Sequence, residues 1–266
     1  MENEDDVRMQ VRDTYAKIAQ TKSEDCGCTC GPSCCSPKSV DANGISAKLG
    51  YSSEELAGVP EGANMGLGCG NPQAIASLAE GEAVLDLGCG GGVDCFLAAL
   101  HVGSSGRVIG VDMTPEMITK AREIAKKGNY ANVEFRLGEI EHLPVADNSV
   151  DVIISNCVVN LSPDKPQVYR DAYRVLKPGG RLAISDIVAV RELPEGFKGD
   201  VEKLAGCIAG AATVDELTAA LEDAGFTDIQ ILLHEESRGF IKDWFPGTGV
   251  EGFVVSASIQ AQKGVC

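Results

Sequence analysis

The spacing of apolar residues changes along this chain and divides it into three parts. Val7, Val11, Tyr15 and Ile18 recur on one helix face, which predicts an amphipathic helix over residues 3–20. Residues 36–80 are rich in glycine and serine, and within them only residues 53–57 favour a short helix. A regular alternation of apolar runs and amphipathic segments begins at residue 83 and continues almost to the end.

This alternation predicts the fold class. The apolar runs predict strands at residues 83–88, 107–112, 132–138, 150–156, 181–187, 226–233 and 252–259. The segments between them predict helices at residues 93–101, 115–127, 164–176 and 214–224. We expect Thr114 to cap the second of these helices, the sequence KPGG (177–180) to stop the third, and Gly225 to stop the last. Strands that alternate with helices predict an α/β fold with a doubly wound, mostly parallel, Rossmann-like sheet of seven strands.

Charge and composition narrow the classes of partner. The chain carries 23 Lys and Arg against 39 Asp and Glu, a formal net charge of −16. Nucleic acids and anionic membranes attract basic surfaces, so neither is expected as a partner. The first six residues are acidic, and no apolar run approaches the roughly 20 residues of a membrane span. We therefore expect a cytoplasmic location.

Eleven cysteines are unusual for a chain predicted to be cytoplasmic. A reducing compartment and an odd number argue against a disulfide framework, which leaves metal, metalloid or redox chemistry. Five of them lie in CGCTCGPSCC (26–35), which its Gly, Pro and Ser residues predict to be a loop. The spacing differs from the paired C-x-x-C of common structural zinc sites, and zinc stays open as an alternative for this cluster.

A glycine-rich turn, GCGGG (88–92), follows the first predicted strand. Such a turn lets a ligand contact bare backbone at the carboxyl edge of the sheet. A pyrophosphate cradle fits poorly, because Val93 occupies the position of the last glycine in the dinucleotide fingerprint counted from Gly88. Asp112 ends the second strand, where a carboxylate can accept both hydroxyls of a ribose. The alternative for Asp112 is a turn or helix-start residue.

Other polar and apolar residues are predicted to lie at the same edge. We expect Glu139 and Ile140, after the third strand, to border an adenine base. Asp86 precedes the glycines and either orients the cofactor's amino group or braces the loop. The candidates for cofactor binding are Asp86, Gly88, Gly90, Asp112, Met113, Glu139, Ile140 and Asn156.

These residues resemble the class I methyltransferases. The resemblance runs through VLDLGCGGG (84–92), GVD (110–112), GEIEHLP (138–144) and RVLKPGG (174–180), in the family's order and spacing over about half of the chain. It implies S-adenosylmethionine as the cofactor and a last strand that enters the sheet antiparallel.

Isolated cysteines outside the loop point to the methyl acceptor. Cys157, in SNCVVNL (155–161), follows the fourth strand at the edge where a methyl group would be presented. Cys207 precedes the late helix, Cys69 precedes the first strand, and all three are expected to converge there. The alternative for each is a buried cysteine that acts as a small hydrophobe, the interpretation we give to Cys89 and Cys95.

The whole pattern resembles the arsenite methyltransferases. The resemblance extends from the N-terminal helix to about residue 212, through the C-C pair, GLGCGNP (66–72), LDLGCGGGVDCF (85–96), GEIEHLP, SNCVVNL and GCIAGA (206–211). It implies arsenic-binding and catalytic thiols at Cys69, Cys157, Cys207 and the C-C pair. Which member of the pair, Cys34 or Cys35, matches the family stays open, and Cys35 is taken as the candidate ligand.

The resemblance also implies roles for three segments. Residues 1–75 are expected to form an N-terminal helix and cysteine-rich capture segment, residues 76–190 the S-adenosylmethionine-binding core, and residues 191–266 the segment that completes the sheet and the arsenic site. The expected acceptors are arsenite and methylarsenite, with a thioredoxin- or glutathione-type thiol as reductant, in arsenic detoxification. The alternatives are a methyltransferase of a small organic acceptor and a non-catalytic metalloid- or zinc-binding protein. The main product and the oligomeric state stay open.

Overall fold

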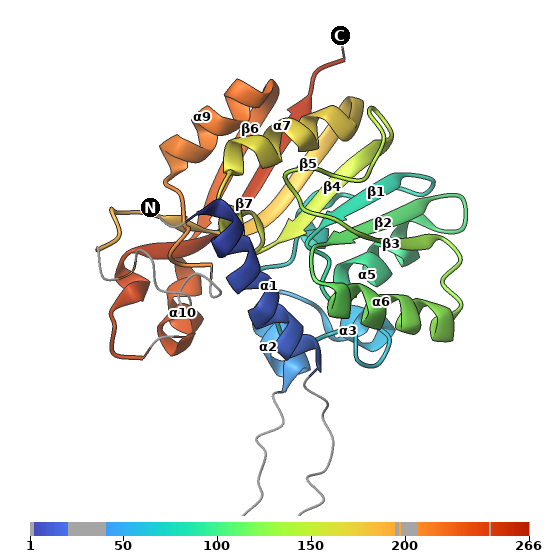
Figure 1. Ribbon diagram of the computed structural model, residues 1–266, viewed down its shortest axis with the longest axis horizontal. Coiled ribbons are helices and arrows are strands. Elements are labelled where there is room, and N and C mark those ends of the chain that lie inside the picture. Colours follow the sequence, from blue (N-terminus) through green and yellow to red (C-terminus); the bar gives the residue numbers. More distant parts are fainter. Residues whose placement is uncertain (1–2, 21–40, 195–196, 198–206, 245, 266) are drawn as a thin grey trace, which may run out of the picture.

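A computed structural model describes residues 3–20, 41–194, 197, 207–244 and 246–265. The described strands form one seven-stranded sheet with the order β3-β2-β1-β4-β5-β7-β6 (Figure 1). The strand bounds are β1 Ala83–Leu87, β2 Arg107–Asp112, β3 Val133–Leu137, β4 Val150–Asn156, β5 Leu176–Ala189, β6 Phe226–His234 and β7 Val254–Lys263.

Strand directions confirm the fold class predicted from the sequence. The strands β1 to β5 pair in parallel, whereas β7 runs antiparallel to both β5 and β6. The strand order reverses between β1 and β4, and at such a switch point the carboxyl ends of parallel strands leave a crevice for ligands. β6 and β7, from the predicted C-terminal segment, belong to the same sheet as the strands of the predicted core. The roles assigned to the three segments, 1–75, 76–190 and 191–266, stay a prediction.

The helices agree with most of the predicted ones. The predicted helices correspond to α1 Glu4–Gln20, α3 Ser53–Gly58, α5 Val93–Val102, α6 Pro115–Gly128, α7 Lys165–Val175 and α9 Val214–Ala224. The sequence pattern did not indicate α2 Ala42–Lys48, α4 Gln73–Ala76, α10 Arg238–Trp244, or the short 3-10 turns η1 Val159–Leu161, η3 Glu235–Ser237 and η4 Val250–Gly252.

Two local predictions need correction. The side chain of Thr114 does not cap α6, although Pro115 begins that helix as expected. The KPGG sequence follows the end of α7 but belongs to β5, which pairs with β4 at Leu176 and again from Arg181 onward. Residues 177–180 therefore bulge out of the ladder, and Gly179 accommodates the bulge with a φ of 80°.

Alternation along the strands places apolar side chains on both faces of the sheet. On one face, Leu85, Ile153 and Ile184 pack with α7 and α9 residues in a single cluster. On the other face, Val84 and Ile154 pack with residues of α4, α5 and α6. Successive strand residues point to opposite faces, so helices on both faces are needed to cover the sheet.

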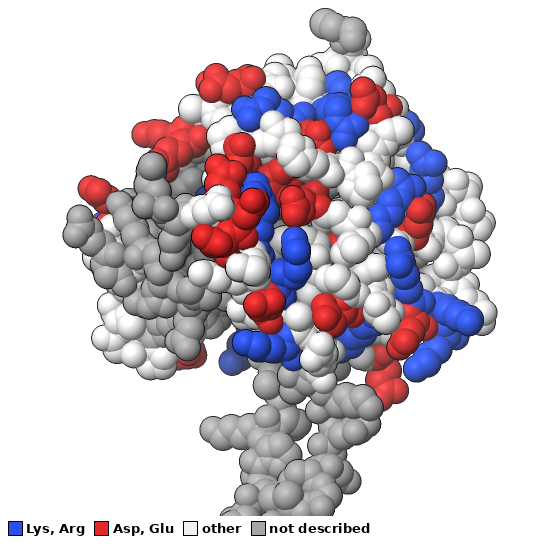
Figure 2. Space-filling view, viewed as in Figure 1, with Lys and Arg blue, Asp and Glu red and all other residues white. Residues whose placement is uncertain are grey.

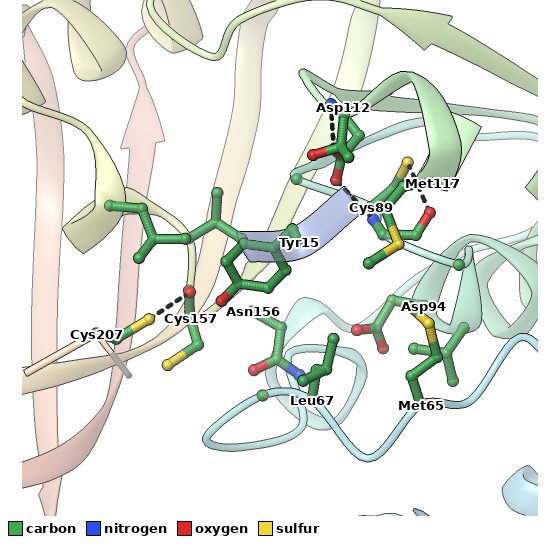
Figure 3. A pocket seen from close by; sticks show the side chains of 18 of the residues that line it. Tyr15, Met65, Leu67, Cys89, Asp94, Asp112, Met117, Asn156, Cys157 and Cys207 are labelled. Carbon is green, nitrogen blue, oxygen red and sulfur yellow. Dashed lines mark hydrogen bonds between the residues drawn. The ribbon is translucent and has the colours of Figure 1, made fainter. Parts of the chain in front are cut away.

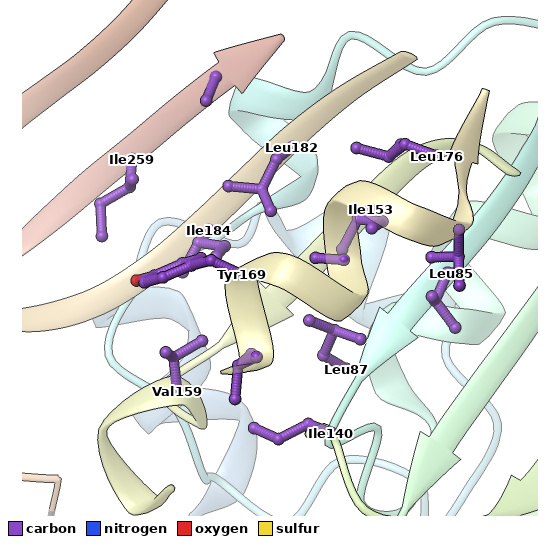
Figure 4. Close-up of a cluster of buried hydrophobic side chains, with 14 of the residues drawn as sticks. Leu85, Leu87, Ile140, Ile153, Val159, Tyr169, Leu176, Leu182, Ile184 and Ile259 are labelled. Atoms are coloured by element: carbon purple, nitrogen blue, oxygen red, sulfur yellow. The ribbon is translucent and has the colours of Figure 1, made fainter. Parts of the chain in front are cut away.

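The first of these clusters is the largest apolar region of the structure (Figure 4). Tyr169 of α7 lies against the sheet with its ring fully buried beside strand residues such as Ile184. Side chains in this cluster expose at most 8% of their surface, so the middle of the strands is rigidly packed.

The surface of the molecule carries charges of both signs. On the face shown in Figure 2, Lys and Arg lie among Asp and Glu, and α9 contributes acidic side chains without a basic one. None of the described helices combines the length and apolar composition that a membrane crossing requires.

Candidate active site

A cavity of about 510 Å³ lies at the carboxyl ends of β1, β2 and β4 (Figure 3). Its walls combine the glycine loop, the ends of these strands, the segment around Met65 and the helix α1. Of the predicted site residues, the cavity is lined by Asp86, Gly88, Gly90, Asp112, Met113, Ile140, Asn156, Cys157 and Cys207. The tertiary structure therefore brings most of the predicted cofactor residues and two of the predicted thiols to one cavity.

The glycine loop at residues 88–92 forms the floor of the cofactor side. Gly88, Gly90 and Gly92 have positive φ angles, which residues with a side chain rarely adopt. A Cβ atom at Gly88 would overlap the side chain of Val158, whereas one at Gly90 would meet only Met65 Cε, at 3.7 Å. The loop therefore packs tightly against Val158 at Gly88. At Gly90 its backbone is open to the cavity.

Asp112 holds this loop in place. One carboxylate oxygen accepts a hydrogen bond from the Gly90 N–H at 2.9 Å, and the other accepts one from the Thr114 N–H at 2.8 Å. Both predicted roles of Asp112 are compatible here, because each oxygen keeps a second lone pair for a ligand hydroxyl. Burial raises the pKa of Asp112, and these backbone hydrogen bonds oppose the rise.

Two further carboxylates lie beneath the cofactor side of the cavity. Asp86 is 2% exposed and accepts a hydrogen bond from the Cys95 thiol at 3.2 Å. Asp94, in the first turn of α5, accepts hydrogen bonds from the Tyr51 hydroxyl at 2.8 and 3.0 Å. Burial raises the pKa of both carboxyls, and for Asp86 the charge of Asp94 adds to the rise. Asp86 thus lies beside a thiol rather than bracing the glycines directly.

Asn156, at the end of β4, connects the cofactor side to the thiols. Its side-chain N–H group donates to the Tyr51 hydroxyl at 3.0 Å and to the Gly70 carbonyl at 2.8 Å. Its oxygen accepts a hydrogen bond from the Cys69 N–H at 3.0 Å. Gly68 has a φ of 125°, and a Cβ atom there would lie 2.8 Å from the Asn156 amide. Glycine at this position lets the Cys69 loop rest directly on Asn156.

The three isolated cysteines converge beside Asn156. The sulfurs of Cys69 and Cys157 and a carboxylate oxygen of Asp186 all lie within 4.8 Å of one another. The Cys69 thiol donates a hydrogen bond to the Ser185 carbonyl at 3.5 Å. Cys207 also donates to the Cys157 carbonyl at 2.7 Å, as Figure 3 shows. The predicted convergence of Cys69, Cys157 and Cys207 is therefore present in the structure.

Backbone geometry at this cluster is unusual. Cys157 and Cys207 have φ angles of 59° and 60°, a left-handed conformation that costs free energy for a residue with a side chain. The Cys157 N–H donates to the Ser185 carbonyl at 2.8 Å, which holds the turn after β4 against β5. A Cβ atom at Gly210 would overlap the Asn160 carbonyl, so glycine there lets the Cys207 segment approach the same turn.

Burial controls the protonation of the cluster. It raises the pKa of the Cys69 thiol to about 12 and also raises that of Cys157. The pKa of Cys207 is raised first by its hydrogen bond with Cys157 and then by burial. The thiols are therefore protonated at neutral pH. Burial raises the pKa of Asp186 to about 6, and hydrogen bonds from the Ile187 and Asn160 N–H groups oppose the rise.

The helix α1 covers the cavity. Val11 and Tyr15 line it from above, and Tyr15 packs against the cluster that contains the three cysteines (Figure 3). Arg8 lies 3.3 Å from the buried carboxylate of Glu141, which also accepts a hydrogen bond from Ser162 at 2.6 Å. This ion pair fastens the helix to the loops that follow β3 and β4.

Glu139 does not lie where its position after the third strand suggested. Its carboxylate lies 3.2 Å from Arg12 on α1, and among the described residues the cavity is lined by Ile140 and Glu141 instead. The ion pair with Arg12 holds the Glu139 side chain against the helix α1. Its expected contact with adenine has no support in this arrangement.

Some predicted residues lie outside the described part of the chain, and some residues of the site were not predicted. Cys34 and Cys35 belong to the first group, as do the other cysteines of the 26–35 loop and Cys266. The second group comprises Tyr15, Tyr51, Asp94 and Asp186. Asp186 had a usable signal, because it lies near the end of the predicted strand 181–187. Tyr15 had none, since its position fits an ordinary apolar helix face.

Comparisons with known sequences agree on the type of domain. A family model described as a methyltransferase domain matches residues 78–225. An arsenite methyltransferase of Halobacterium salinarum is 53% identical over 268 residues, covering 97% of this chain and 67% of that relative. An arsenite methyltransferase of Aquipseudomonas alcaligenes is 39% identical, covering 84% of this chain and 62% of that relative. The chain spans about two thirds of the length of these relatives.

Comparisons with solved structures lead to the same group. The crystal structure of an arsenic(III) S-adenosylmethionine methyltransferase from Chlamydomonas reinhardtii matches with a TM-score of 0.61 at 34% identity, over 83% of this chain and 73% of that one. A phosphoethanolamine N-methyltransferase of Haemonchus contortus matches with a TM-score of 0.62 at 20% identity, over 84% of this chain and 57% of that one. The second likeness shows the shared fold alone.

Proposed function

This chain belongs to the arsenite methyltransferase family of S-adenosylmethionine-dependent enzymes, and from that premise we propose that Cys69, Cys157 and Cys207 hold trivalent arsenic for methylation. The observation that supports this proposal is the meeting of three buried thiols from separate segments, two of which, Cys157 and Cys207, line the cavity. A methyltransferase of small organic molecules has no need of such a cluster.

The protonated thiols suit arsenous acid. When As(OH)₃ exchanges its hydroxides for three thiols, each thiol proton leaves with a hydroxide as water, so no charge is created in the buried site. A divalent metal ion would have to expel those protons into solvent before it could bind, and burial opposes this. Thiolates are soft ligands that select soft metals, and the same preference favours the binding of trivalent arsenic at this cluster.

The cofactor side of the cavity fits S-adenosylmethionine. The bare backbone at Gly90, the carboxylate of Asp112 and the apolar side chains of Met113 and Ile140 offer surfaces for its amino acid, ribose and base. Asn156 connects this side to the thiols through its hydrogen bond with the Cys69 N–H, and Asp86 also lines the cavity. When bound, S-adenosylmethionine supplies an electrophilic methyl group on a positively charged sulfur.

The residues of the chain act by positioning rather than by proton transfer. Arsenic bonded to three sulfurs keeps one lone pair, which carries no proton and needs no general base. The thiols hold this lone pair toward the cofactor side, and Val11 and Tyr15 cover the site against water. Holding two reactants in line can contribute as much as about 7–11 kcal/mol to lowering a barrier.

Arsenic is formally oxidised from As(III) to As(V) by the transfer, so a complete cycle needs two electrons. We propose that two cysteine thiolates supply them by forming a disulfide, which returns arsenic to As(III). An external thiol of the thioredoxin or glutathione type then reduces the disulfide by exchange. Cys34 or Cys35 is a candidate partner in this disulfide. The requirement for reduced thiols agrees with a cytoplasmic location, which stays a prediction.

Incubation with arsenite, S-adenosylmethionine and a dithiol, followed by arsenic speciation, tests the proposed function. We expect methylated arsenic from the wild-type chain and none from Cys157→Ser. Cys95→Ser is the matched control, because its thiol is equally buried but contacts Asp86 rather than the cluster. Methylation of small organic acceptors without any methylation of arsenite would contradict the proposal.

A zinc or other divalent metal site is the second candidate, because Cys69, Cys157 and Asp186 together offer metal ligands. The two functions differ in their dependence on pH. Arsenite binding should change little between pH 6 and pH 8, because exchange releases water. Zinc binding should strengthen steeply with pH, because each ligating thiol must lose a proton. Titration with both ligands at the two pH values distinguishes them.

A further inference from the structure

Asp186 is a buried carboxylate that the mechanism above does not use. It lies in β5, directly after Ser185, whose carbonyl accepts hydrogen bonds from the Cys157 N–H at 2.8 Å and from the Cys69 thiol at 3.5 Å. Its side chain is 3% exposed, and one of its oxygens lies within 4.8 Å of the sulfurs of Cys69 and Cys157. An arsenic atom bound to these sulfurs would therefore have this carboxylate as a close neighbour.

The carboxylate is held rigidly. It accepts hydrogen bonds from the Asn160 side chain at 2.9 Å, from the Ile187 N–H at 2.8 Å and from the Asn160 N–H at 3.3 Å. Within the described parts of the chain, no Lys or Arg nitrogen forms an ion pair with it at 4.0 Å or less. Asp186 is thus a buried carboxylate that hydrogen bonds hold in place and that forms no ion pair at this distance among the described residues.

Methyl transfer moves a positive charge toward this position. The arsenic lone pair forms the new As–C bond while the C–S bond breaks, and the electron pair of that bond stays on sulfur as a neutral thioether. The charge of the sulfonium ion therefore passes to arsenic. Arsenic with three thiolate ligands is neutral before this step and positive after it, so a nearby negative charge stabilises the transition state more than the bound substrate.

The other carboxylates of the site lie elsewhere. Asp112 contacts the glycine loop, and Asp86 and Asp94 lie beneath the cofactor side. These charges stabilise the sulfonium before the reaction, which by itself does not lower the barrier. Asp186 is the carboxylate that lies with the thiols among the described residues.

We propose that Asp186 stabilises the positive charge that arsenic acquires during methyl transfer. This inference rests on the proposed function, because it requires arsenic at the three thiols. It assigns to Asp186 a role in the chemical step and no role in binding S-adenosylmethionine. It also explains why β5 carries a buried charge whose burial would otherwise only cost stability.

Single-turnover methylation by Asp186→Asn tests the proposal. With arsenite and S-adenosylmethionine both bound, the rate should fall roughly 100- to 1,000-fold, the size expected for removal of one preorganised electrostatic group. Arsenic stoichiometry and S-adenosylmethionine affinity should stay within twofold of wild type. Asp171→Asn is the matched control, because Asp171 is also a buried carboxylate but contacts Arg174 and the Leu143 N–H. An unchanged rate, or a loss of arsenic binding as large as the loss of rate, would overturn the proposal.

A second variant tests the same charge without altering Asp186. The positive charge of Lys165 lowers the pKa of Asp186 and that of Cys207, so it opposes a negative charge at this end of the cavity. Lys165→Met should therefore raise the single-turnover rate about twofold or more. Lys177→Met is the control, since Lys177 pairs with Asp151 at the opposite end of β4. An unchanged or lower rate for Lys165→Met contradicts the proposal, even if Asp186→Asn fails to fold.

The outcomes separate this inference from the proposed function. A wild-type chain that does not methylate arsenite refutes the proposed function itself. A wild-type chain that methylates arsenite while Asp186→Asn keeps the wild-type rate refutes only the role of Asp186.

Discussion

The middle of the sheet and the carboxyl ends of the same strands are built from different kinds of residue. In β4 and β5, Ile153 and Ile184 are completely buried among apolar side chains (Figure 4). Two to four residues further on, the ends of the same strands and the turn after β4 present Asn156, Cys157 and Asp186, which are polar or reactive although they are largely buried. The strand centres supply stability, and the buried charges and left-handed cysteines at the strand ends reduce it. Substitutions in the two regions should therefore change different properties.

The largest effect is expected at the thiols. Cys157→Ser and Cys207→Ser should each reduce methylation of both arsenite and methylarsenite by roughly 10³-fold or more, because the arsenic loses a ligand at the point of transfer. The melting temperature should change little, since serine is nearly isosteric with cysteine. Rates and thermal unfolding measured on the same samples check this. Loss of folding in both variants would show that the thiols are structural.

The centre of the sheet should respond in the opposite way. Ile153→Ala removes a fully buried side chain and should lower the free energy of unfolding by about 3 kcal/mol. The rate per folded molecule should remain close to that of wild type, because Ile153 does not line the cavity. Denaturant unfolding tests the expected loss of stability, and rate measurements below the melting temperature test the expected unchanged activity. A rate that falls as strongly as for Cys157→Ser would erase the distinction between the two regions.

Replacement of Cys69 should affect the methylation of arsenite and of methylarsenite differently. Arsenite offers three exchangeable oxygens and can bind three thiols, whereas methylarsenite can bind two. Cys69→Ser should therefore reduce the arsenite rate more than about tenfold and leave the methylarsenite rate within a few-fold of wild type. Rates on both acceptors provide the measurement. Equal losses on the two substrates would make Cys69 a structural cysteine.

Asp112→Ala tests the cofactor side of the cavity at the carboxyl edge of the sheet. Losing a charge-assisted acceptor, together with the brace on Gly90, should weaken S-adenosylmethionine binding by about 1.5–3 kcal/mol. Arsenite binding should remain intact, because Asp112 contacts the glycine loop and not the thiols. Calorimetric titration with each ligand compares the two affinities. Unchanged cofactor affinity would contradict the ribose assignment.

The smallest effect is expected inside the apolar cluster, at a polar atom without a hydrogen bond. The Tyr169 hydroxyl is buried and has no hydrogen-bond partner among the described residues. Tyr169→Phe should therefore leave activity unchanged and stabilise the fold by as much as about 1 kcal/mol. A comparison of the unfolding curves of wild type and Tyr169→Phe shows whether the free energy of unfolding rises or falls. A clear loss of stability would mean that the hydroxyl binds a water molecule.

Local patterns were sufficient for much of this protein. Continuous apolar runs located the seven strands, and helical spacing of apolar residues located the main helices, because each element buries residues that are close in sequence. Parallel strands bring their carboxyl ends to one edge, so the sequence alone predicted that Gly88, Asp112 and Cys157 lie together, and all three line the cavity. The family resemblance added the identity of the cofactor and the acceptor.

Other features depended on contacts between distant segments. Glu139 turns toward Arg12, on a helix 127 residues earlier, and no local pattern indicates that pair. Cys69 lies 87 residues before Asn156, and Cys207 lies 50 residues after Cys157. Their meeting depends on the close approach of Gly68 to Asn156 and of Gly210 to Asn160. A thiol cluster buries little surface in any one segment, so tertiary packing alone decides which cysteines lie together and which carboxylate lies beside them.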